Sequence, residues 1–318
     1  MVLKIDVHTH ALPGFFKKIL SELGPAESGV PQISWSMDAT RRSMAELDIG
    51  TSILSLSAPG PEIAPNRDGA RSLARQFNEW AAKETKADPS GIGFFAAVPG
   101  LQDTDGCLTE IRYAFDELKA DGVCFFTTYQ GVYHGDPSFE PIWKELNVRA
   151  AVVFIHPTMP LGFKLTSTMI QPPTFDFPRE TGRTAAHMVI TGMKRRYPDV
   201  KVILSYERLA ILESGLFLKE LDANSPKTFD EIIEDARSFY FDLALCGAAN
   251  VLDSLFRWAP AGHVLYGSDF PYATVEAEYN TRRLEAYDIG LEERKRYYAG
   301  NGLVLFPRLQ AEAPYRHA

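Results

Sequence analysis

The sequence predicts an α/β protein whose fold is a (β/α)8 TIM barrel. Eight short runs of β-branched, aromatic and other apolar residues recur at intervals of roughly thirty residues, the length of one strand–helix unit. Between them lie segments with the apolar period of about 3.6 residues that amphipathic helices have. The strand-like runs are apolar almost throughout, as are strands of a parallel sheet covered on both faces. Their number and even spacing favour a barrel over a doubly wound sheet, and no GxGxxG motif opens the first helix.

The expected strands are rich in the residue types that fit a pleated, buried surface. In order, they are Leu3–Val7, Thr51–Leu56, Gly93–Val98, Gly122–Phe126, Ala151–Ile155, Lys201–Leu204, Phe239–Leu243 and His263–Tyr266. Because all strands of such a barrel run parallel, their carboxyl ends meet at one face, where the active sites of these barrels lie.

Several expected helices follow a polar residue that can accept a hydrogen bond from the backbone of the first turn. The segments are Ala39–Leu47 after Asp38, Arg67–Thr85 after Asn66, Cys107–Leu118 after Asp103 or Asp105, Phe139–Asn147, Thr184–Arg196, Phe229–Arg237 and Ala248–Trp258. Each separates two strands, as the crossover helices of a barrel do.

Two long segments show no helical or strand period. Ala11–Ser36 follows the first expected strand and Pro157–Pro178 the fifth, so both lie on the catalytic face. Long loops in compact domains are often lids or binding loops. Linkers and internal repeats are absent, and we expect residues 1–318 to form a single barrel domain.

The composition is that of an ordinary soluble globular protein, with 45% hydrophobic and 23% charged residues. A formal net charge of -8 argues against non-specific binding to nucleic acids, which needs a basic surface. No apolar run approaches membrane-spanning length, and no secretory signal opens the chain. The three cysteines are scattered without CxxC spacing, which favours a reducing compartment. We therefore expect a cytoplasmic protein with no nucleic-acid or membrane partner.

The first expected strand ends in two histidines separated by one residue, His8 and His10. Alternate residues of a strand point to the same face, so the two imidazoles project together while Thr9 points away. Two neutral imidazoles that converge at a strand end form half of a transition-metal site.

Two further residues complete this candidate site. His156 ends the fifth strand, and Asp269 follows the eighth in the run Gly-Ser-Asp-Phe-Pro. Barrel closure would bring all four residues together at one face. Three imidazoles and a carboxylate suit one divalent metal, for which we expect Zn²⁺, with Mn²⁺, Fe²⁺ or Co²⁺ as alternatives. An open coordination position would hold water or substrate, as in catalytic sites.

The other histidines differ in position, and of these His263 and His187 are expected to be structural. His263 begins the eighth strand on the opposite face, His187 lies within a helix, and His317 is in the tail. His134 follows the fourth strand, where a surface turn is preferred over a contact with the site.

These motifs resemble the metal-dependent amidohydrolase superfamily, specifically the branch with aminocarboxymuconate semialdehyde, γ-resorcylate and 6-methylsalicylate decarboxylases. The resemblance to the 6-methylsalicylate type covers nearly the whole chain. It is carried by Asp6–Pro13, Ser55–Gly60, Gly93–Ala96, Gly135–Pro141, Phe154–Thr158, Gly267–Tyr272 and Asn301–Phe306. It implies an amidohydrolase-like barrel that holds one divalent metal through His8, His10, His156 and Asp269, and a homodimer or homotetramer.

One position departs from the family pattern. The family ends its sixth strand with a histidine, and alignment of the preceding segment Arg196–Val200 places Tyr206 there in this chain. A phenol with an ordinary pKa of about 10 does not replace a neutral imidazole as a base near neutral pH. Tyr206 could instead donate a hydrogen bond to a metal-bound carboxylate or phenolate, or merely fill space. The next residue, Glu207, would point to the other side of the strand.

The resemblance implies an enzyme, a metal-dependent carboxy-lyase that acts on a small aromatic or conjugated carboxylic acid similar to 6-methylsalicylate. The metal would bind the carboxylate and an adjacent oxygen, and Asp269 would deliver a proton to the carbon that loses CO₂. Because of Tyr206 two alternatives stay open: a metal-dependent hydrolase, isomerase or other lyase on a related polyketide-type molecule, or a catalytically impaired binding protein. The setting that the resemblance suggests is secondary metabolism or aromatic catabolism.

Substrate recognition is expected to need one arginine and several aromatic walls. The candidate arginines are Arg41 and Arg42 in the first helix and Arg179 or Arg183 after the loop of the fifth strand. The candidate walls are Phe126, Tyr129, Phe270 and Tyr272, near strand ends. Of these, Arg41, Tyr129 and Phe270 are the predicted substrate-binding residues.

Overall fold

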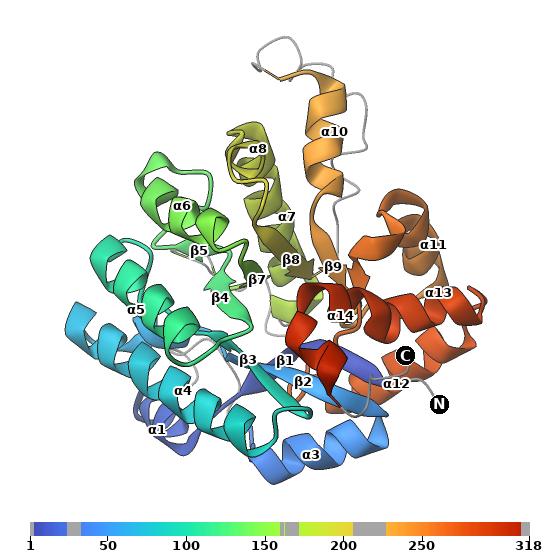
Figure 1. Cartoon of the computed structure of the whole chain (residues 1–318), viewed down its shortest axis with the longest axis horizontal. Coiled ribbons are helices and arrows are strands. Elements are labelled where there is room, and N and C mark those ends of the chain that lie inside the picture. The colour runs from blue at the N-terminus through green and yellow to red at the C-terminus, as the bar shows by residue number, and fades with distance from the viewer. Residues whose placement is uncertain (1–2, 24–32, 160–161, 163–171, 206–226, 313–318) are drawn as a thin grey trace.

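The computed structural model describes residues 3–23, 33–159, 162, 172–205 and 227–312. Eight parallel strands form one sheet in the order β1-β2-β3-β4-β7-β8-β9-β10, with helices arranged around it (Figure 1). The strands are β1 Lys4–Ala11, β2 Ile49–Leu56, β3 Ile92–Ala96, β4 Gly122–Phe126, β7 Val152–His156, β8 Lys201–Ser205, β9 Tyr240–Asp242 and β10 Val264–Leu265. All eight predicted strands are therefore present.

Backbone hydrogen bonds join the last strand to the first. The Val7 amide donates to the Tyr266 carbonyl at 3.0 Å, and the His10 amide donates to the Phe270 carbonyl at 2.8 Å. Together with the pairing of neighbouring strands, these bonds close the sheet and confirm the predicted (β/α)8 barrel.

Each predicted helical segment has a counterpart at approximately the expected position. The crossover helices are α3 Met37–Glu46, α4 Arg67–Ala87, α5 Thr104–Asp116, α6 Glu140–Val148, α7 Pro172–Ile190, α8 Met193–Arg196, α10 Phe229–Arg237 and α11 Ala249–Trp258. The predicted segment Thr184–Arg196 is divided between two of these helices, α7 and α8. Asn66 and Asp103 cap α4 and α5, as predicted. The cap of α3 is Ser36 rather than Asp38, because the helix begins two residues earlier than expected and Asp38 lies in its first turn.

The two segments expected to be loops contain helices. Helix α1, Gly14–Leu23, occupies part of the first segment, where Phe16 and Leu20 lie one turn apart and are both buried. Helix α7 begins at Pro172 and accommodates Pro178 in its interior, so the proline-rich composition misled the prediction. A short hairpin, β5 Thr128–Tyr129 with β6 Val132–Tyr133, follows β4 and packs near α7.

The chain after β10 forms helices that the sequence pattern did not predict. They are α12 Thr274–Ala286, α13 Leu291–Lys295, a π-helical turn η5 Arg296–Gly300, α14 Asn301–Leu305 and the 3₁₀ turn η6 Pro307–Ala311. Leu305, Phe306 and Leu309 are buried with Ile5 and Phe95 in the barrel interior. This segment closes the amino-terminal end of the barrel, which leaves the carboxyl end for the site. No helix in the described residues is long and apolar enough to cross a membrane.

Candidate metal centre

A register irregularity in β1 determines which side chains of this strand face the site. Ile5 and Val7 belong to the interior core, and the pairing of β1 with β2 shifts between Asp6 and Thr9. A bulge of this kind redirects the side chains that follow it. After the bulge, His8 and His10 face the carboxyl end of the barrel, with ring centroids 5.3 Å apart. The predicted convergence of the two imidazoles is confirmed.

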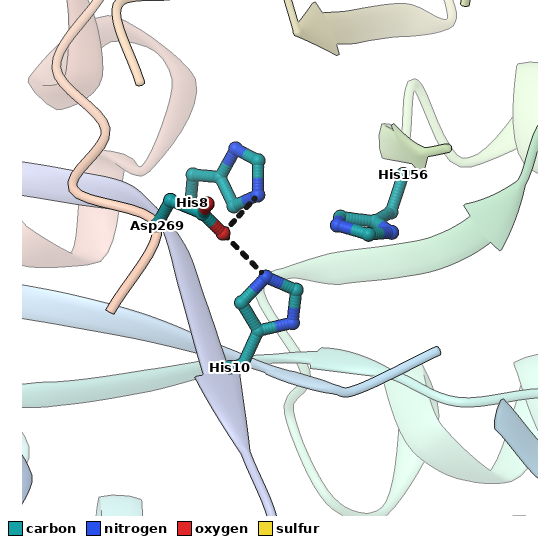
Figure 2. Close-up of side chains that lie close together, drawn as sticks. All are labelled: His8, His10, His156 and Asp269. Carbon is teal, nitrogen blue, oxygen red and sulfur yellow. Dashed lines mark hydrogen bonds and ion pairs between the residues drawn. The ribbon is translucent and has the colours of Figure 1, made fainter. Parts of the chain in front are cut away.

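Asp269 and His156 join the two histidines from other strands (Figure 2). His156 ends β7, and its ring lies 4.7 Å from that of His10. Asp269 follows β10 in the left-handed region with φ 59°, a conformation that Asp adopts more readily than most residues. Its Oδ1 lies 2.9 Å from His10 Nε2 and 3.4 Å from His8 Nε2. One potential ligand atom from each of the four residues lies within 4.8 Å of the others.

Asp242 and Ser205 hold His8 in place from behind. His8 Nδ1 lies 3.1 Å from Asp242 Oδ2 and 3.2 Å from Ser205 Oγ. The Ser205 hydroxyl also donates to Asp242 at 3.1 Å, and Asp242 is fully buried. A carboxylate on one ring nitrogen fixes the imidazole so that the other nitrogen can face a metal. Neither residue was predicted to belong to the site, although an acidic residue that ends the apolar strand β9 is the signal that could have identified Asp242.

Asp6 fixes the loop that carries Asp269. Its carboxylate accepts hydrogen bonds from the Ser268 amide at 3.0 Å and from the Thr9 hydroxyl at 2.7 Å. Burial raises the pKa of Asp6 to about 6, although the hydrogen bonds from Ser268 and Thr9 oppose this shift. Asp6 thus ties β1 to the loop after β10 and sets the position of Asp269.

The protonation preferences of the histidines suit a cation in the centre of the group. Burial favours the neutral form of His8, but the charges of Asp242 and Asp269 outweigh it and raise the pKa of His8 to about 9. Burial lowers the pKa of His10, and burial with the neighbouring His10 lowers that of His156 well below its usual value. The carboxylates therefore stabilise positive charge here, while two of the three imidazoles stay neutral and available as ligands.

Buried ring nitrogens without a partner support the same conclusion. His8 Nε2, His10 Nδ1 and His156 Nδ1 are buried and have no hydrogen-bond partner in the described structure. Buried polar atoms are normally paired. Of these three nitrogens, His8 Nε2 is directed at Asp269, 3.4 Å from its Oδ1, whereas the nitrogen of His10 that lies against Asp269 is Nε2. Three nitrogens and a carboxylate oxygen are the donor set of catalytic divalent-metal sites. The residues present therefore fit one divalent metal.

The four residues lie at the base of a cavity of about 740 Å³. Its side walls are mainly apolar and come from α7 and from the loop after β9, with Pro172, Phe177, Ala244 and Ala248 among the lining residues. The Phe177 ring lies 6.2 Å from that of His156, edge to face. An apolar cavity with polar groups gathered at one end is typical of a site for a small, largely apolar ligand.

Comparison with known proteins agrees with this geometry. The amidohydrolase family model matches residues 5–308. The chain belongs to the amidohydrolase family. A 6-methylsalicylic acid decarboxylase of Penicillium expansum is 41% identical over 314 residues, which cover 96% of this amidohydrolase and 97% of that protein. A 6-methylsalicylic acid decarboxylase of Aspergillus aculeatus is 43% identical over 324 residues, 98% of each chain.

Solved structures share the fold of this amidohydrolase. An amidohydrolase II superposes with a TM-score of 0.86 at 27% identity over 96% of this chain and 99% of the other. A dihydroxybenzoic acid decarboxylase from a Polaromonas strain, with bound manganese and 2-nitroresorcinol, gives a TM-score of 0.82 at 22% identity over 100% of both chains. Because the identity of the latter is low, that similarity concerns the fold alone.

The predicted substrate-binding residues of this amidohydrolase do not line the cavity in the part of the chain that the structure describes. Arg41 lies 3.9 Å from Asp88, which precedes β3 at the amino-terminal end of the barrel. Tyr129 and Phe270 are buried in the core. Of the four aromatic residues proposed as walls, Tyr272 lines the cavity.

Among the described residues one arginine lines the cavity, and it was not a predicted substrate-binding residue. Arg283 on α12 lies over the ring of Tyr279, 5.1 Å from its centroid, and donates to its hydroxyl at 3.0 Å. Both residues line the cavity. Helix α12 was not predicted, so no sequence signal connected Arg283 to the site.

The remaining predicted residues divide into three groups. His134 was expected at a surface turn, but it is 1% exposed and its Nε2 lies 2.6 Å from the Phe126 carbonyl, so that prediction was wrong. His187 accepts from the Gly135 amide at 3.0 Å and His263 Nδ1 lies 2.9 Å from the Phe239 carbonyl, consistent with structural roles. Tyr206, Glu207 and His317 lie outside the described residues.

Proposed function

We propose that this amidohydrolase is a metal-dependent carboxy-lyase that removes CO₂ non-oxidatively from a small aromatic acid of the 6-methylsalicylate type. The observation that carries the proposal is the convergence of His8, His10, His156 and Asp269 at the base of a mainly apolar cavity. The similarity over nearly the full length to two 6-methylsalicylic acid decarboxylases supports the choice of reaction and substrate class.

The metal that we propose is Zn²⁺, with Mn²⁺ as the alternative because a structural relative holds manganese. When bound by the four residues, it supplies a Lewis acid for the carboxylate and neighbouring oxygen of the substrate. Asp242 and Ser205 orient His8, while Asp6 and Ser268 position Asp269. The walls around Phe177 exclude water from the aromatic ring of the substrate.

In the proposed reaction Asp269 is also the residue that moves the proton. Its carboxyl group delivers a proton to the ring carbon that carries the carboxylate, the bond from that carbon to the carboxylate breaks, and CO₂ leaves. Water restores the proton on Asp269, so the net reaction consumes one proton and needs no oxidant. Arg283 at the cavity wall attracts the anionic substrate.

A substrate screen with Asp269→Asn tests the proposal. The metal-loaded protein should release CO₂ from 6-methylsalicylate, and Asp269→Asn should lower turnover by at least about a hundredfold, since general acid–base groups contribute on that order. Metal analysis of both proteins separates loss of the proton donor from loss of the metal. Chelator-sensitive hydrolysis without CO₂ release would contradict the reaction, and binding without turnover would indicate an impaired enzyme.

The role of Tyr206 is a separate proposal, in which its hydroxyl contributes a hydrogen bond to the bound acid. Tyr206→Phe should then lower turnover, whereas Tyr206→His should raise it if tyrosine limits a reaction that imidazole performs better. Unchanged turnover in Tyr206→Phe would indicate that Tyr206 only fills space.

We further propose that residues 1–318 form one domain and that the protein acts in the cytoplasm as a homodimer or homotetramer, in secondary metabolism. The three cysteines are buried and lie far apart in the sequence, which is consistent with a reducing compartment. Sedimentation analysis of the purified protein tests the oligomeric state, and a monomer would contradict it.

A further inference from the structure

Two hydroxyl groups that are not metal ligands face the same cavity and contact each other. Ser57 follows β2 and Tyr272 follows Asp269 by three residues. The oxygen atoms Ser57 Oγ and Tyr272 Oη are 2.7 Å apart, and both residues line the cavity. The Tyr272 ring packs edge-on against His10, with centroids 4.9 Å apart. The hydroxyl pair is therefore adjacent to the metal centre.

Counting protons shows that this pair can donate one more hydrogen bond. Two hydroxyls carry two protons, and the bond between them uses one. Within the described chain, neither side chain has another hydrogen-bond partner. The proton of the second hydroxyl therefore has no acceptor among the described residues. This hydroxyl lies at the wall of the cavity. Such a proton is available to an oxygen atom of a bound ligand.

The burial of the two residues assigns the direction of this hydrogen-bond chain. Ser57 is 1% exposed, whereas Tyr272 is only half-buried. The phenol is thus the group nearer the open space, and the serine lies behind it. A Ser57 hydroxyl that donates to Tyr272 Oη leaves the phenolic proton directed at the ligand. Hydrogen bonds in such a chain polarise and strengthen one another.

We propose that Tyr272 is a substrate-binding residue whose hydroxyl donates to an oxygen of an aromatic acid held at the metal centre, and that Ser57 is a positioning residue that donates to Tyr272. This inference rests on the proposed function for the class of ligand. A carboxylate or phenolate oxygen suits the phenolic donor, because hydrogen bonds to charged acceptors are the stronger ones. Neither hydroxyl transfers a proton in this scheme.

The test is the affinity of the metal-loaded protein for salicylate, measured by calorimetry. Tyr272→Phe should weaken binding about tenfold, the usual cost of a lost hydrogen bond to a charged group. Ser57→Ala should weaken it about two- to threefold, because the phenol stays but loses its polarising donor. In the Tyr272→Phe background, Ser57→Ala should have no further effect, since the serine acts through the tyrosine.

Tyr266 provides a matched control. Its hydroxyl lies 2.8 Å from Thr281 Oγ1, so it forms the same kind of pair, but neither residue lines the cavity among the described residues. Tyr266→Phe should leave the salicylate affinity unchanged. Metal content and melting temperature are measured for every variant, so that a purely structural effect is recognised.

The outcomes separate this inference from the function on which it rests. If the wild-type protein binds salicylate and Tyr272→Phe binds it equally well, the inference is wrong while the proposed function stands. A weakening in Tyr272→Phe that is matched by loss of bound metal also overturns the inference. If the wild-type protein binds no aromatic acid, the proposed function fails and the inference fails with it.

Discussion

At the scale of single residues, the site depends on side chains that never touch the metal. Asp242 and Ser205 fix the ring of His8, and Asp6 fixes the loop of Asp269. A buried carboxylate of this kind selects the tautomer of the histidine and makes it a stronger ligand. The four ligands therefore need their neighbours in order to form one centre.

Asp242→Asn should weaken metal binding by about ten- to a hundredfold, the range found when such supporting groups are removed. Ser205→Ala should have a smaller effect, because the contact between His8 and Asp242 persists. Competition with a chelator measures both affinities. An Asp242→Asn protein that binds metal as tightly as the wild type would show that the carboxylate does not support His8.

Arg283 and its neighbour Arg282 allow a controlled test of whether a positive charge at the cavity attracts the anionic substrate. Arg283 lines the cavity, whereas Arg282 does not and is ion-paired with Glu278 on the exposed side of α12. Arg283→Gln should raise KM for an anionic substrate several-fold, with an effect that shrinks as ionic strength rises. Arg282→Gln removes the same charge and should leave KM nearly unchanged. Equal effects in the two variants would indicate a general influence of net charge.

At the scale of elements, the segment after β6 carries a buried histidine that makes stability depend on pH. Burial lowers the pKa of His134 to about 4, and its Nε2 lies 2.6 Å from the Phe126 carbonyl. In the unfolded chain an imidazole titrates near its ordinary pKa of about 6.5. Above that pH both states are neutral, whereas below it the unfolded state binds the proton first and folding becomes less favourable.

The expected size of this effect follows from the two pKa values. Between pH 7 and pH 5, the contribution of His134 should lower the free energy of unfolding by about 2 kcal/mol. His134→Gln keeps a donor for the Phe126 carbonyl but cannot titrate, so its stability should fall less over this interval. Urea unfolding at both pH values measures the difference. An identical fall in the two proteins would contradict the assignment.

The elements also show where sequence patterns succeed. The strands were predictable because apolar β-branched runs are a strong signal, and the caps Asn66 and Asp103 act as expected. The second part of α7 was predicted as a helix beginning at Thr184, but its proline-rich start was missed because it resembles a loop, although proline is tolerated in the first turn of a helix. The register shift in β1 could not be predicted, since it arises from the pairing with β2.

At the scale of the whole molecule, barrel closure explains why four distant ligands could be predicted. Each lies near the carboxyl end of a recognisable strand or just after it, and the topology gathers the strand ends at one face. The residues that form the cavity walls were harder to predict from the sequence. Phe177 and Arg283 lie on helices whose positions depend on tertiary packing, so sequence position alone did not connect them to the site.

The segment after α14 closes the amino-terminal end of the barrel, so truncation of its buried side chains should lower the free energy of unfolding. Phe306 is 2% exposed and packs against Phe95, with ring centroids 6.0 Å apart. Phe306→Ala should lower the free energy of unfolding by about 3 to 5 kcal/mol, as is usual for a buried phenylalanine. The nearby Val304 is 70% exposed, and Val304→Ala should change it by less than about 0.5 kcal/mol. Urea denaturation measures both changes. Similar losses of unfolding free energy in the Phe306→Ala and Val304→Ala variants would contradict the role of Phe306 in closing the barrel.

The most direct test is an anomalous-scattering map of a crystal of the metal-loaded protein, recorded at the absorption edge of the bound element. We expect a single peak between His8, His10, His156 and Asp269, with ligand distances of about 2.0 to 2.3 Å. A map without a peak among these side chains, from protein that turns over substrate, would contradict the account.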